Sequence, residues 1–229
     1  MRAISFPRLE TITLATLAGL SVMYAYAACA FIFAPAHFAA LMAEMGPLES
    51  VGALACLVAA ILFFGVFVKA LRSKSYGRAL WLLGLAVVSA LLALEEVSWG
   101  QHIFGFATPA GIAALNAQHE TNFHNFRGIH TQSHELGILI LLAFFVVAPL
   151  LATNDRLSGV FETLQMPVVP LQIAALFAFS YAGFEAFRIL YYLLPAPGVN
   201  YGELQETAYE LVLLLFAVTL FAFPETSQA

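Results

Sequence analysis

Residues that can do acid–base or metal chemistry are concentrated in one stretch of the chain, residues 95–135. Five of the six histidines fall in this stretch, which is also rich in Asn, Gln, Glu and aromatic side chains. Two of them, His130 and His134, are four residues apart, a spacing that places two imidazoles on one face of a helix, as in helical zinc sites. We therefore expect a divalent metal here, with zinc as the candidate. The expected metal ligands are His102, His119, His124, His130 and His134.

Two adjacent carboxylates, Glu95 and Glu96, directly follow an apolar run and are the candidates for a general base. If their helix continues, Glu95 shares one face with Ser98 and His102, whereas Glu96 lies about 100° away. Ionisable groups in an apolar span are costly and usually mark function. The expected catalytic residues are Glu95, Glu96, Ser98, Glu120 and Arg188. The expected substrate-binding residues are Trp99, Gln101, Asn116, Asn122, Asn125, Glu185, Tyr192, Glu206 and Glu210.

Each of these groups also has a purely structural interpretation. The histidines could hydrogen-bond to neighbouring Asn side chains and hold the connection in place. Glu185 and Arg188, which share a helical stripe, could form an ion pair that satisfies itself. The stripe of Glu203, Glu206 and Glu210 could simply be solvated, at the end of a helix near the membrane interface. The residue types alone leave both interpretations open.

The elements that must position these residues are membrane helices. The chain has 229 residues, of which 62% are hydrophobic and only 10% charged, whereas a soluble domain normally carries about 25% charged residues. We expect one all-α domain, residues 1–229, with six transmembrane helices, because backbone groups in lipid must be paired within each span. The expected spans, each about 20 apolar residues long, are 11–34, 49–70, 78–97, 135–153, 167–193 and 204–223.

An interfacial or re-entrant helix from about 109 to 118 is expected between the third and fourth spans. Thr108 and Pro109 predict its start, because threonine caps free amides and proline suits the first turn. At the N-terminus, the apolar run of residues 11–34 is longer than the apolar region of a signal peptide, so we expect a retained first helix.

Basic residues predict the orientation of the chain in the membrane. Seven of the nine Lys and Arg residues fall on one side if both termini are cytoplasmic, namely Arg2, Arg8, Lys69, Arg72, Lys74, Arg78 and Arg156. We expect a multi-pass protein of the bacterial inner membrane, with the 99–134 connection on the periplasmic side. The net charge of −5 and the lack of a basic patch argue against a nucleic-acid partner. Two cysteines in apolar runs indicate neither a disulfide framework nor a thiolate metal site.

Two stretches, at the end of the third expected span and in the connection that follows it, resemble those of a family of uncharacterised bacterial polytopic membrane proteins. One reads Glu-Glu-x-Ser-Trp-Gly-Gln at 95–101, and the other Asn-x-Gln-x-Glu-x-Asn-x-His-Asn at 116–125, with His119 at one of the variable positions. Together they cover less than a tenth of the chain. The resemblance implies membership of that family and supplies no activity.

A second, site-level likeness involves two pairs with the same spacing, Ser98 with His102 and His130 with His134. This pattern resembles the alkaline ceramidase superfamily, seven-helix membrane hydrolases in which three histidines hold zinc and a Ser and an Asp support it. The chain departs from that pattern because six spans are expected, the two pairs lie close together in the sequence and no Asp is nearby. Only Glu95, Glu96 or Glu120 could replace the missing carboxylate.

These patterns favour an integral-membrane enzyme, a metal-dependent hydrolase or transferase acting on a lipid or lipid-linked substrate at the outer leaflet. The metal would activate water or polarise the scissile bond, and Arg188 would orient an anionic head group. Membrane lipid is the expected partner. An outward-facing small-molecule transporter or binding protein is an alternative, although few polar residues continue across the inner half of the spans. A non-catalytic assembly subunit is another, and a haem-binding subunit is the least favoured because no span has a central histidine.

Overall fold

The computed structural model describes residues 7–43, 45–117, 119–123, 126, 130–194 and 201–223, without the side chains of residues 7, 8 and 130–135. Within these ranges the regular secondary structure is entirely helical, apart from an isolated bridge between Asn116 and Phe126. The predicted all-α class is therefore confirmed.

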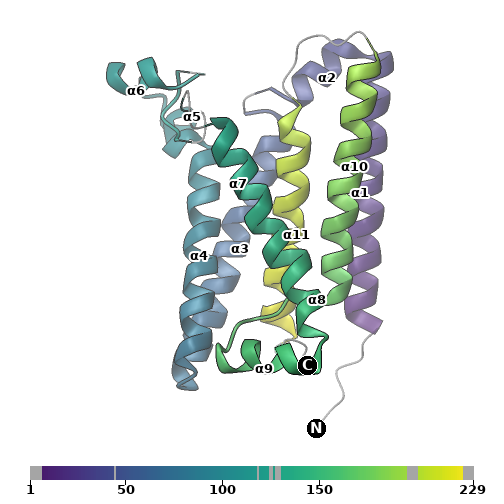
Figure 1. The fold of residues 1–229 in the computed structure, drawn as a ribbon. Helices are drawn as coiled ribbons and strands as arrows, with labels where there is room; N and C mark the ends of the chain where they lie inside the picture. Colours follow the sequence, from purple (N-terminus) through teal and green to yellow (C-terminus); the bar gives the residue numbers. More distant parts are fainter. Residues whose placement is uncertain are drawn as a thin grey trace.

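Five helices are long and apolar enough to cross a membrane. They are α1 (Pro7–Phe33), α3 (Pro47–Arg72), α4 (Tyr76–Glu96), α10 (Leu171–Leu193) and α11 (Gly202–Ala222). They coincide with five of the six expected spans, to within a few residues at each end. Figure 1 shows them running side by side as a bundle, as expected for a multi-pass membrane protein.

The segment expected as the fourth span is less regular. It begins as α7 (His130–Leu142), widens into a π-helical turn called η2 (Ala143–Val147) and ends as α8 (Ala148–Ala152). Pro149 accounts for the widened turn, because its ring has no N–H and would clash with the carbonyl of Phe145 in a regular helix. The apolar part of this segment, Leu136–Ala152, is shorter than the other five spans.

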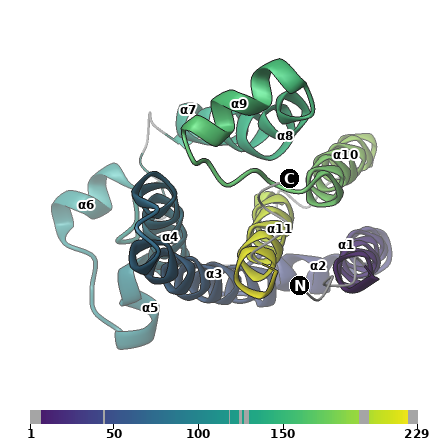
Figure 2. The same ribbon diagram turned by 90° about the horizontal axis from the view of Figure 1, so that it is seen from below.

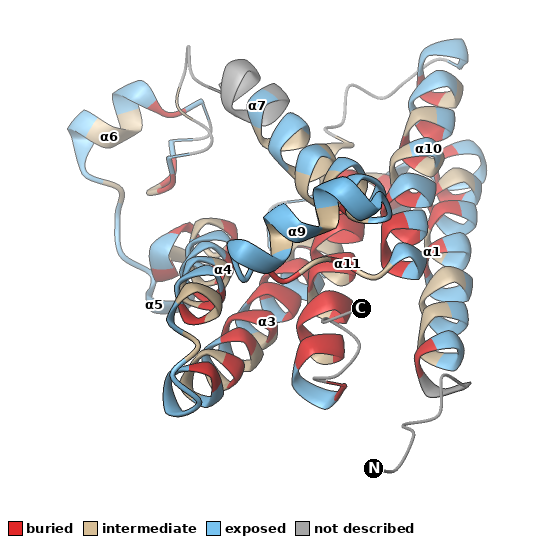
Figure 3. Cartoon of the chain, turned by 60° about the horizontal axis from the view of Figure 1, so that its bottom comes forward, coloured by how far each residue is buried: buried red, intermediate tan, exposed pale blue. Residues whose placement is uncertain are grey.

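The long helices stand in a curved row, with α7, α8 and α9 (Asp155–Thr163) on one side of it (Figure 2). In this row α4 packs against α3, α3 against α11, α11 against α10, and α10 against α1. Helix α11 is central, since 72% of the residues in its most apolar stretch are buried. In α4, at the end of the row, only 28% of the corresponding residues are buried. Figure 3 shows the same contrast, with buried residues dominating α11.

Stacked aromatic rings connect the central helix to the irregular fourth segment. The ring of Tyr209 on α11 lies 4.6 Å from that of Phe177 on α10, and Phe177 lies 5.0 Å from Phe145 in η2. Phe145 also meets Phe216 on α11 at 6.0 Å. Aromatic pairs add stabilisation beyond the apolar area that they bury, so these rings fix η2 against α10 and α11.

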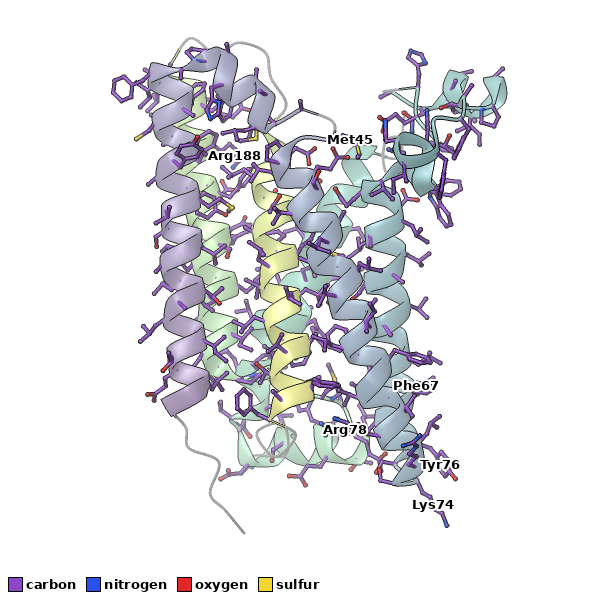
Figure 4. The ribbon with its side chains drawn as sticks, turned by 180° about the vertical axis from the view of Figure 1, so that it is seen from behind. Met45, Phe67, Lys74, Tyr76, Arg78 and Arg188 are labelled. Carbon is purple, nitrogen blue, oxygen red and sulfur yellow. The ribbon has the colours of Figure 1, made fainter. Side chains whose placement is uncertain are left out.

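The two ends of the bundle differ chemically. Lys74 and Arg78 lie where α3 turns into α4, and Arg188 lies near the opposite end (Figure 4). We call the end with Lys69, Arg72, Lys74 and Arg78 the basic end. The short helices α2 (Pro35–Leu41), α5 (Gln101–Phe104) and α6 (Ala110–Leu115) lie at the other end, the loop end (Figure 1). The predicted connection between the third and fourth spans therefore lies at the loop end.

Candidate functional site

The chain turns sharply after α4, so the prediction of a helical face continuing from Glu95 to His102 is wrong. Ser98, Trp99 and Gly100 have φ angles of 45°, 55° and 85°, all in the left-handed region. This conformation costs roughly 1–2 kcal/mol for each residue that carries a Cβ. Such strain persists only where the surroundings determine the backbone, as they often do at functional sites. The hydrogen bonds below the turn supply that constraint.

Glu120 is the centre of a buried network under this turn. One carboxylate oxygen accepts hydrogen bonds from the Ser98 hydroxyl at 2.7 Å and the Asn122 amide at 2.8 Å. The other lies 2.7 Å from Nε2 of His102. The hydroxyl of Ser98 therefore donates to a carboxylate, whereas a nucleophilic serine donates to the imidazole of its base. In this arrangement Ser98 and His102 both position Glu120.

Two asparagines complete the network. The amide of Asn116 donates to the backbone oxygen of Asn122 at 2.9 Å and to its side-chain oxygen at 2.6 Å. The side-chain oxygen of Asn116 accepts from the backbone N–H of Glu120 at 3.2 Å. Both asparagines are buried. A buried network whose members bond to one another holds a loop in one conformation. The structural interpretation expected histidines bonded to these asparagines, whereas His102 bonds to Glu120 and His119 to a backbone oxygen.

The short helix in this loop differs from the expected one. Helix α6 spans Ala110–Leu115 and follows Pro109, so the prediction of a cap at Thr108 and a helix reaching residue 118 is wrong. The hydroxyl of Thr108 instead donates to Oε1 of Gln101 at 3.0 Å, an atom that also accepts the backbone N–H of Thr121 at 2.8 Å. Helix α6 ends early because Asn116 leaves it to join the network.

Glu95 faces this loop. Its carboxylate accepts the indole N–H of Trp99 at 2.5 Å and the backbone N–H of Phe123 at 2.7 Å. The two aromatic rings meet edge to face with centroids 6.0 Å apart. Beside them is a cavity of about 300 Å³ lined by Trp99, Ile112, Thr121, Asn122 and Phe123. Glu95 thus orders the aromatic wall of a small cavity.

Glu96, the next residue, belongs to a second polar site at the loop end. Carboxylate oxygens of Glu96, Glu203 and Glu206 all lie within 4.8 Å of one another. Glu49 and Glu210 are close enough to add their charge to that of Glu96. We call these five residues the glutamate cluster. The consecutive helices α3 and α4 converge there with α11, which is far from both in the sequence.

The cluster continues into the bundle at Glu210. The thiol of Cys56 donates to Oε1 of Glu210 at 3.2 Å. Gly52 leaves room for this carboxylate, because a Cβ at that position would lie 1.9 Å from its Oε2. Sequence reasoning missed Glu49 and Gly52 and assigned Cys56 only to packing. The signal that could have found them is their spacing of three and four residues, which places all three on one face of α3.

Helix ends explain part of the cluster and leave Glu96 unexplained. Glu49 and Glu203 lie in the first turns of α3 and α11, where the helix dipole favours a negative charge. Glu96 is the last residue of α4, where the dipole disfavours an anion, and is 9% exposed. Carboxylates that share a site disfavour one another's ionised form. A proton or a cation would reduce that repulsion, and carboxylate oxygens are ligands for hard divalent cations.

Several predicted residues lie apart from both sites. Glu185 and Arg188 form an ion pair along α10 at 2.5 Å, which agrees with their structural interpretation. Tyr201 donates a hydrogen bond to Tyr192 at 3.1 Å. Burial and this hydrogen bond raise the pKa of Tyr201 to about 12. His119 is exposed and its Nδ1 lies 2.8 Å from the backbone oxygen of Ala113.

The predicted histidine ligands do not meet in the described part of the chain. His102 is held by Glu120 and His119 by a backbone oxygen. His124 and Asn125 lie outside the described residues, as do the side chains of His130 and His134, whose helix α7 begins at the loop end. Among the described side chains, Glu96, Glu203 and Glu206 are the group whose ligand atoms are close enough for one metal ion.

The two stretches that resemble the bacterial family lie against each other. Contacts join Glu95 to Phe123, Ser98 to Glu120 and Gln101 to Thr121, so residues 95–101 pair with residues 120–123. Comparison of the chain with protein-family models, curated proteins and solved structures found no match.

Proposed function

We propose that the protein is an integral-membrane enzyme that binds a divalent cation in the glutamate cluster and hydrolyses or transfers a group of a lipid or lipid-linked substrate. The observation that carries the proposal is the convergence of Glu96, Glu203 and Glu206, whose carboxylate oxygens lie within 4.8 Å of one another. When bound, the cation would activate water or polarise a phosphoryl or carbonyl oxygen. Glu210, the deepest member, would accept the proton.

The carboxylate ligands change the expected cation. Oxygen ligands suit Mg²⁺ and Mn²⁺, whereas imidazole and thiolate ligands suit zinc. His130 and His134 remain proposed additional ligands, because the helix that carries them begins at the same end of the bundle as the cluster. If both imidazoles join the carboxylates, the preference moves back towards Mn²⁺ or Zn²⁺.

We also propose the placement of the chain in the membrane. Segments α7, η2 and α8 form the fourth of six spans, and α5 and α6 lie in the interface. The clustering of Lys69, Arg72, Lys74 and Arg78 at one end supports a cytoplasmic basic end in the bacterial inner membrane. The glutamate cluster then opens at the outer leaflet, where a lipid substrate can enter sideways. The resemblance of residues 95–101 and 116–125 supports membership of the bacterial polytopic family.

A second candidate is a cation-coupled transporter. It is favoured by Glu210 and Cys56, which extend the polar site inward along α11 and α3. Ser89 on α4 is also fully buried, and its hydroxyl has no hydrogen-bond partner among the described residues. A transporter would move a labelled cation across a vesicle membrane without altering a lipid. An enzyme would alter a lipid without moving the cation.

Cation binding is the first test. Purified protein in detergent is titrated with MnCl₂, MgCl₂ and ZnCl₂ by calorimetry, and its metal content is measured by mass spectrometry. We expect stoichiometric binding that Glu96→Gln and Glu206→Gln weaken by at least roughly tenfold, since even groups behind metal ligands matter by 10–100-fold. Glu162→Gln, on the exposed surface of α9, is the matched control. Binding that all three variants leave unchanged contradicts the proposal.

Activity is the second test. The protein is reconstituted in vesicles of bacterial phospholipids supplemented with a polyprenyl phosphate, and lipids are analysed by mass spectrometry with and without EDTA. A lipid product that needs the cation, and that Glu206→Gln abolishes while Glu162→Gln retains, supports the enzyme. Cation uptake without a lipid product supports the transporter instead.

A further inference from the structure

The cavity beside Glu95 has the properties of a hydrocarbon site. The rings of Trp99 and Phe123 and the side chain of Ile112 line it. The polar atoms of its other two lining residues are engaged, because Asn122 belongs to the Glu120 network and Thr121 bonds to Gln101 and Thr108. A ligand of this cavity therefore meets apolar walls and few free hydrogen-bonding groups, which favours an apolar ligand.

The loop that carries the cavity also exposes apolar side chains. Phe104 is 79% exposed, Ile103 62% and Leu115 58%, all on this loop. Exposed aromatic and aliphatic side chains at the end of a transmembrane helix are typical of segments that sit in the membrane interface. These side chains favour a position of the loop at the depth of lipid head groups and upper acyl chains.

The exposed side of α4 ends close to the cavity. Leu91 and Leu94 are exposed near the end of α4, and Trp99 lies within the left-handed turn that follows. In a membrane these leucines contact acyl chains, since α4 stands at the end of the helix row (Figure 2). A lipid chain that lies along these leucines therefore ends near Trp99, and the Glu95 carboxylate between them is hydrogen-bonded to Trp99 and Phe123.

From these apolar walls and the lipid-facing helix beside them we propose that the cavity between Trp99, Ile112 and Phe123 binds one acyl chain of a membrane phospholipid. The volume of about 300 Å³ is at the small end of the roughly 300–1,000 Å³ range of ligand pockets. It fits a segment of one chain and excludes a whole lipid. The site goes beyond the proposed cation chemistry, because Glu95 orders the cavity wall whereas the cation cluster uses Glu96.

The chain has two tryptophans, which makes the site directly observable. Trp99 lines the cavity, and Trp81 lies at the basic end, where its indole N–H donates to the backbone oxygen of Leu164 at 3.1 Å. Trp81→Phe leaves Trp99 as the sole fluorophore, and Trp99→Phe leaves Trp81. Each protein, in a non-brominated detergent, is titrated with a phosphatidylglycerol brominated on one acyl chain.

We expect saturable quenching of Trp99 and only gradual, non-saturating quenching of Trp81. Excess unbrominated phosphatidylglycerol should restore the Trp99 emission. Ile112→Phe, which fills the cavity, should abolish saturation in the Trp81→Phe background. Leu54→Phe enlarges an exposed residue of α3, away from the cavity, and should retain it. Glu96→Gln should also retain it, so failure of the cation site is distinguishable from failure of this one.

Equal, non-saturating quenching of both tryptophans overturns the proposal. Saturable quenching that Ile112→Phe leaves intact, in protein that elutes as a single folded species, overturns it as well. If Ile112→Phe does not fold, the competition by unbrominated lipid decides the matter, since a bulk partition effect is not reversed by a small excess of competitor.

Discussion

Glu95 and Glu96 are consecutive residues whose carboxylates belong to two different sites. Glu95 accepts hydrogen bonds from Trp99 and from the backbone of Phe123. Glu96 converges with Glu203 and Glu206 of α11. Because successive helical residues point about 100° apart, the last turn of α4 supplies one carboxylate to the loop and one to the interior of the bundle.

Glu95→Gln and Glu96→Gln should therefore have separable effects. We expect Glu95→Gln to shift the emission of Trp99 and leave Mn²⁺ affinity unchanged, because Glu95 bonds Trp99 and Phe123 while the proposed cation ligands are Glu96, Glu203 and Glu206. Glu96→Gln should lower Mn²⁺ affinity and leave the Trp99 emission unchanged. Fluorescence in a Trp81→Phe background and calorimetry measure the two effects. If each variant changed both the Trp99 emission and the Mn²⁺ affinity, Glu95 and Glu96 would belong to a single site.

The Glu120 network should carry much of the stability of the loop end. Glu120→Ala leaves Ser98, His102 and Asn122 without their common acceptor, and breaking such a buried pair typically costs about 3–5 kcal/mol. Ser98→Ala should cost about 1.5–3 kcal/mol, the range for a hydrogen bond to a charged group. The free energies of unfolding are measured by denaturant titration in detergent. The double variant should cost less than the sum, because the two residues are in direct contact.

Gly52 should control the position of the Glu210 carboxylate. In Gly52→Ala the new methyl group would overlap Oε2 of Glu210, which must swing away from its place in the glutamate cluster. We expect a loss of Mn²⁺ affinity measured by calorimetry. Gly84→Ala is the matched control, since a Cβ on that α4 residue meets no atom within 4 Å. That control should stabilise the helix by about 0.4–1 kcal/mol.

Tyr24 should stabilise the packing of α1 against α10. Its hydroxyl donates to the backbone oxygen of Ser180 at 2.8 Å, and its ring packs 3.0 Å from the Cβ position of Gly183. Tyr24→Phe should lower the free energy of unfolding by about 0.6 kcal/mol, the mean for hydrogen bonds between membrane helices. Tyr76→Phe, at an exposed position of α4, should have no effect in the same assay. A similar loss of unfolding free energy in both variants would mean that the hydrogen bond from Tyr24 to Ser180 is not its cause.

The sequence predicted the helices well because membrane spans depend on local composition. Apolar runs located α1, α3, α4, α10 and α11 within a few residues. The same reasoning misjudged the residues after Glu96, because nothing local favours a left-handed Ser98 or Trp99. The Ser98 conformation is held by hydrogen bonds with Glu120 and Asn122, more than 20 positions away.

The glutamate cluster could be predicted only in part. The stripe of Glu203, Glu206 and Glu210 and the different direction of Glu96 followed from helical geometry. Their convergence depends on the tertiary packing, in which α3 lies between α4 and α11. The spacing of residues along one helix does not specify that packing. Glu49 and Gly52 were missed, and Cys56 was assigned only to packing, because the face of α3 that they share gains its role only when α11 packs against it.

The two sites of the α4 end differ in when they can form during synthesis. The network joins residues at most 28 positions apart, so the third connection has all its partners soon after it leaves the ribosome. The bond between Cys56 and Glu210 spans 154 positions. Domains form from the N-terminal side as the chain is made, so the glutamate cluster is completed only when the last helix inserts. A chain cut short before α11 would therefore keep the folded loop and lack three of the five carboxylates.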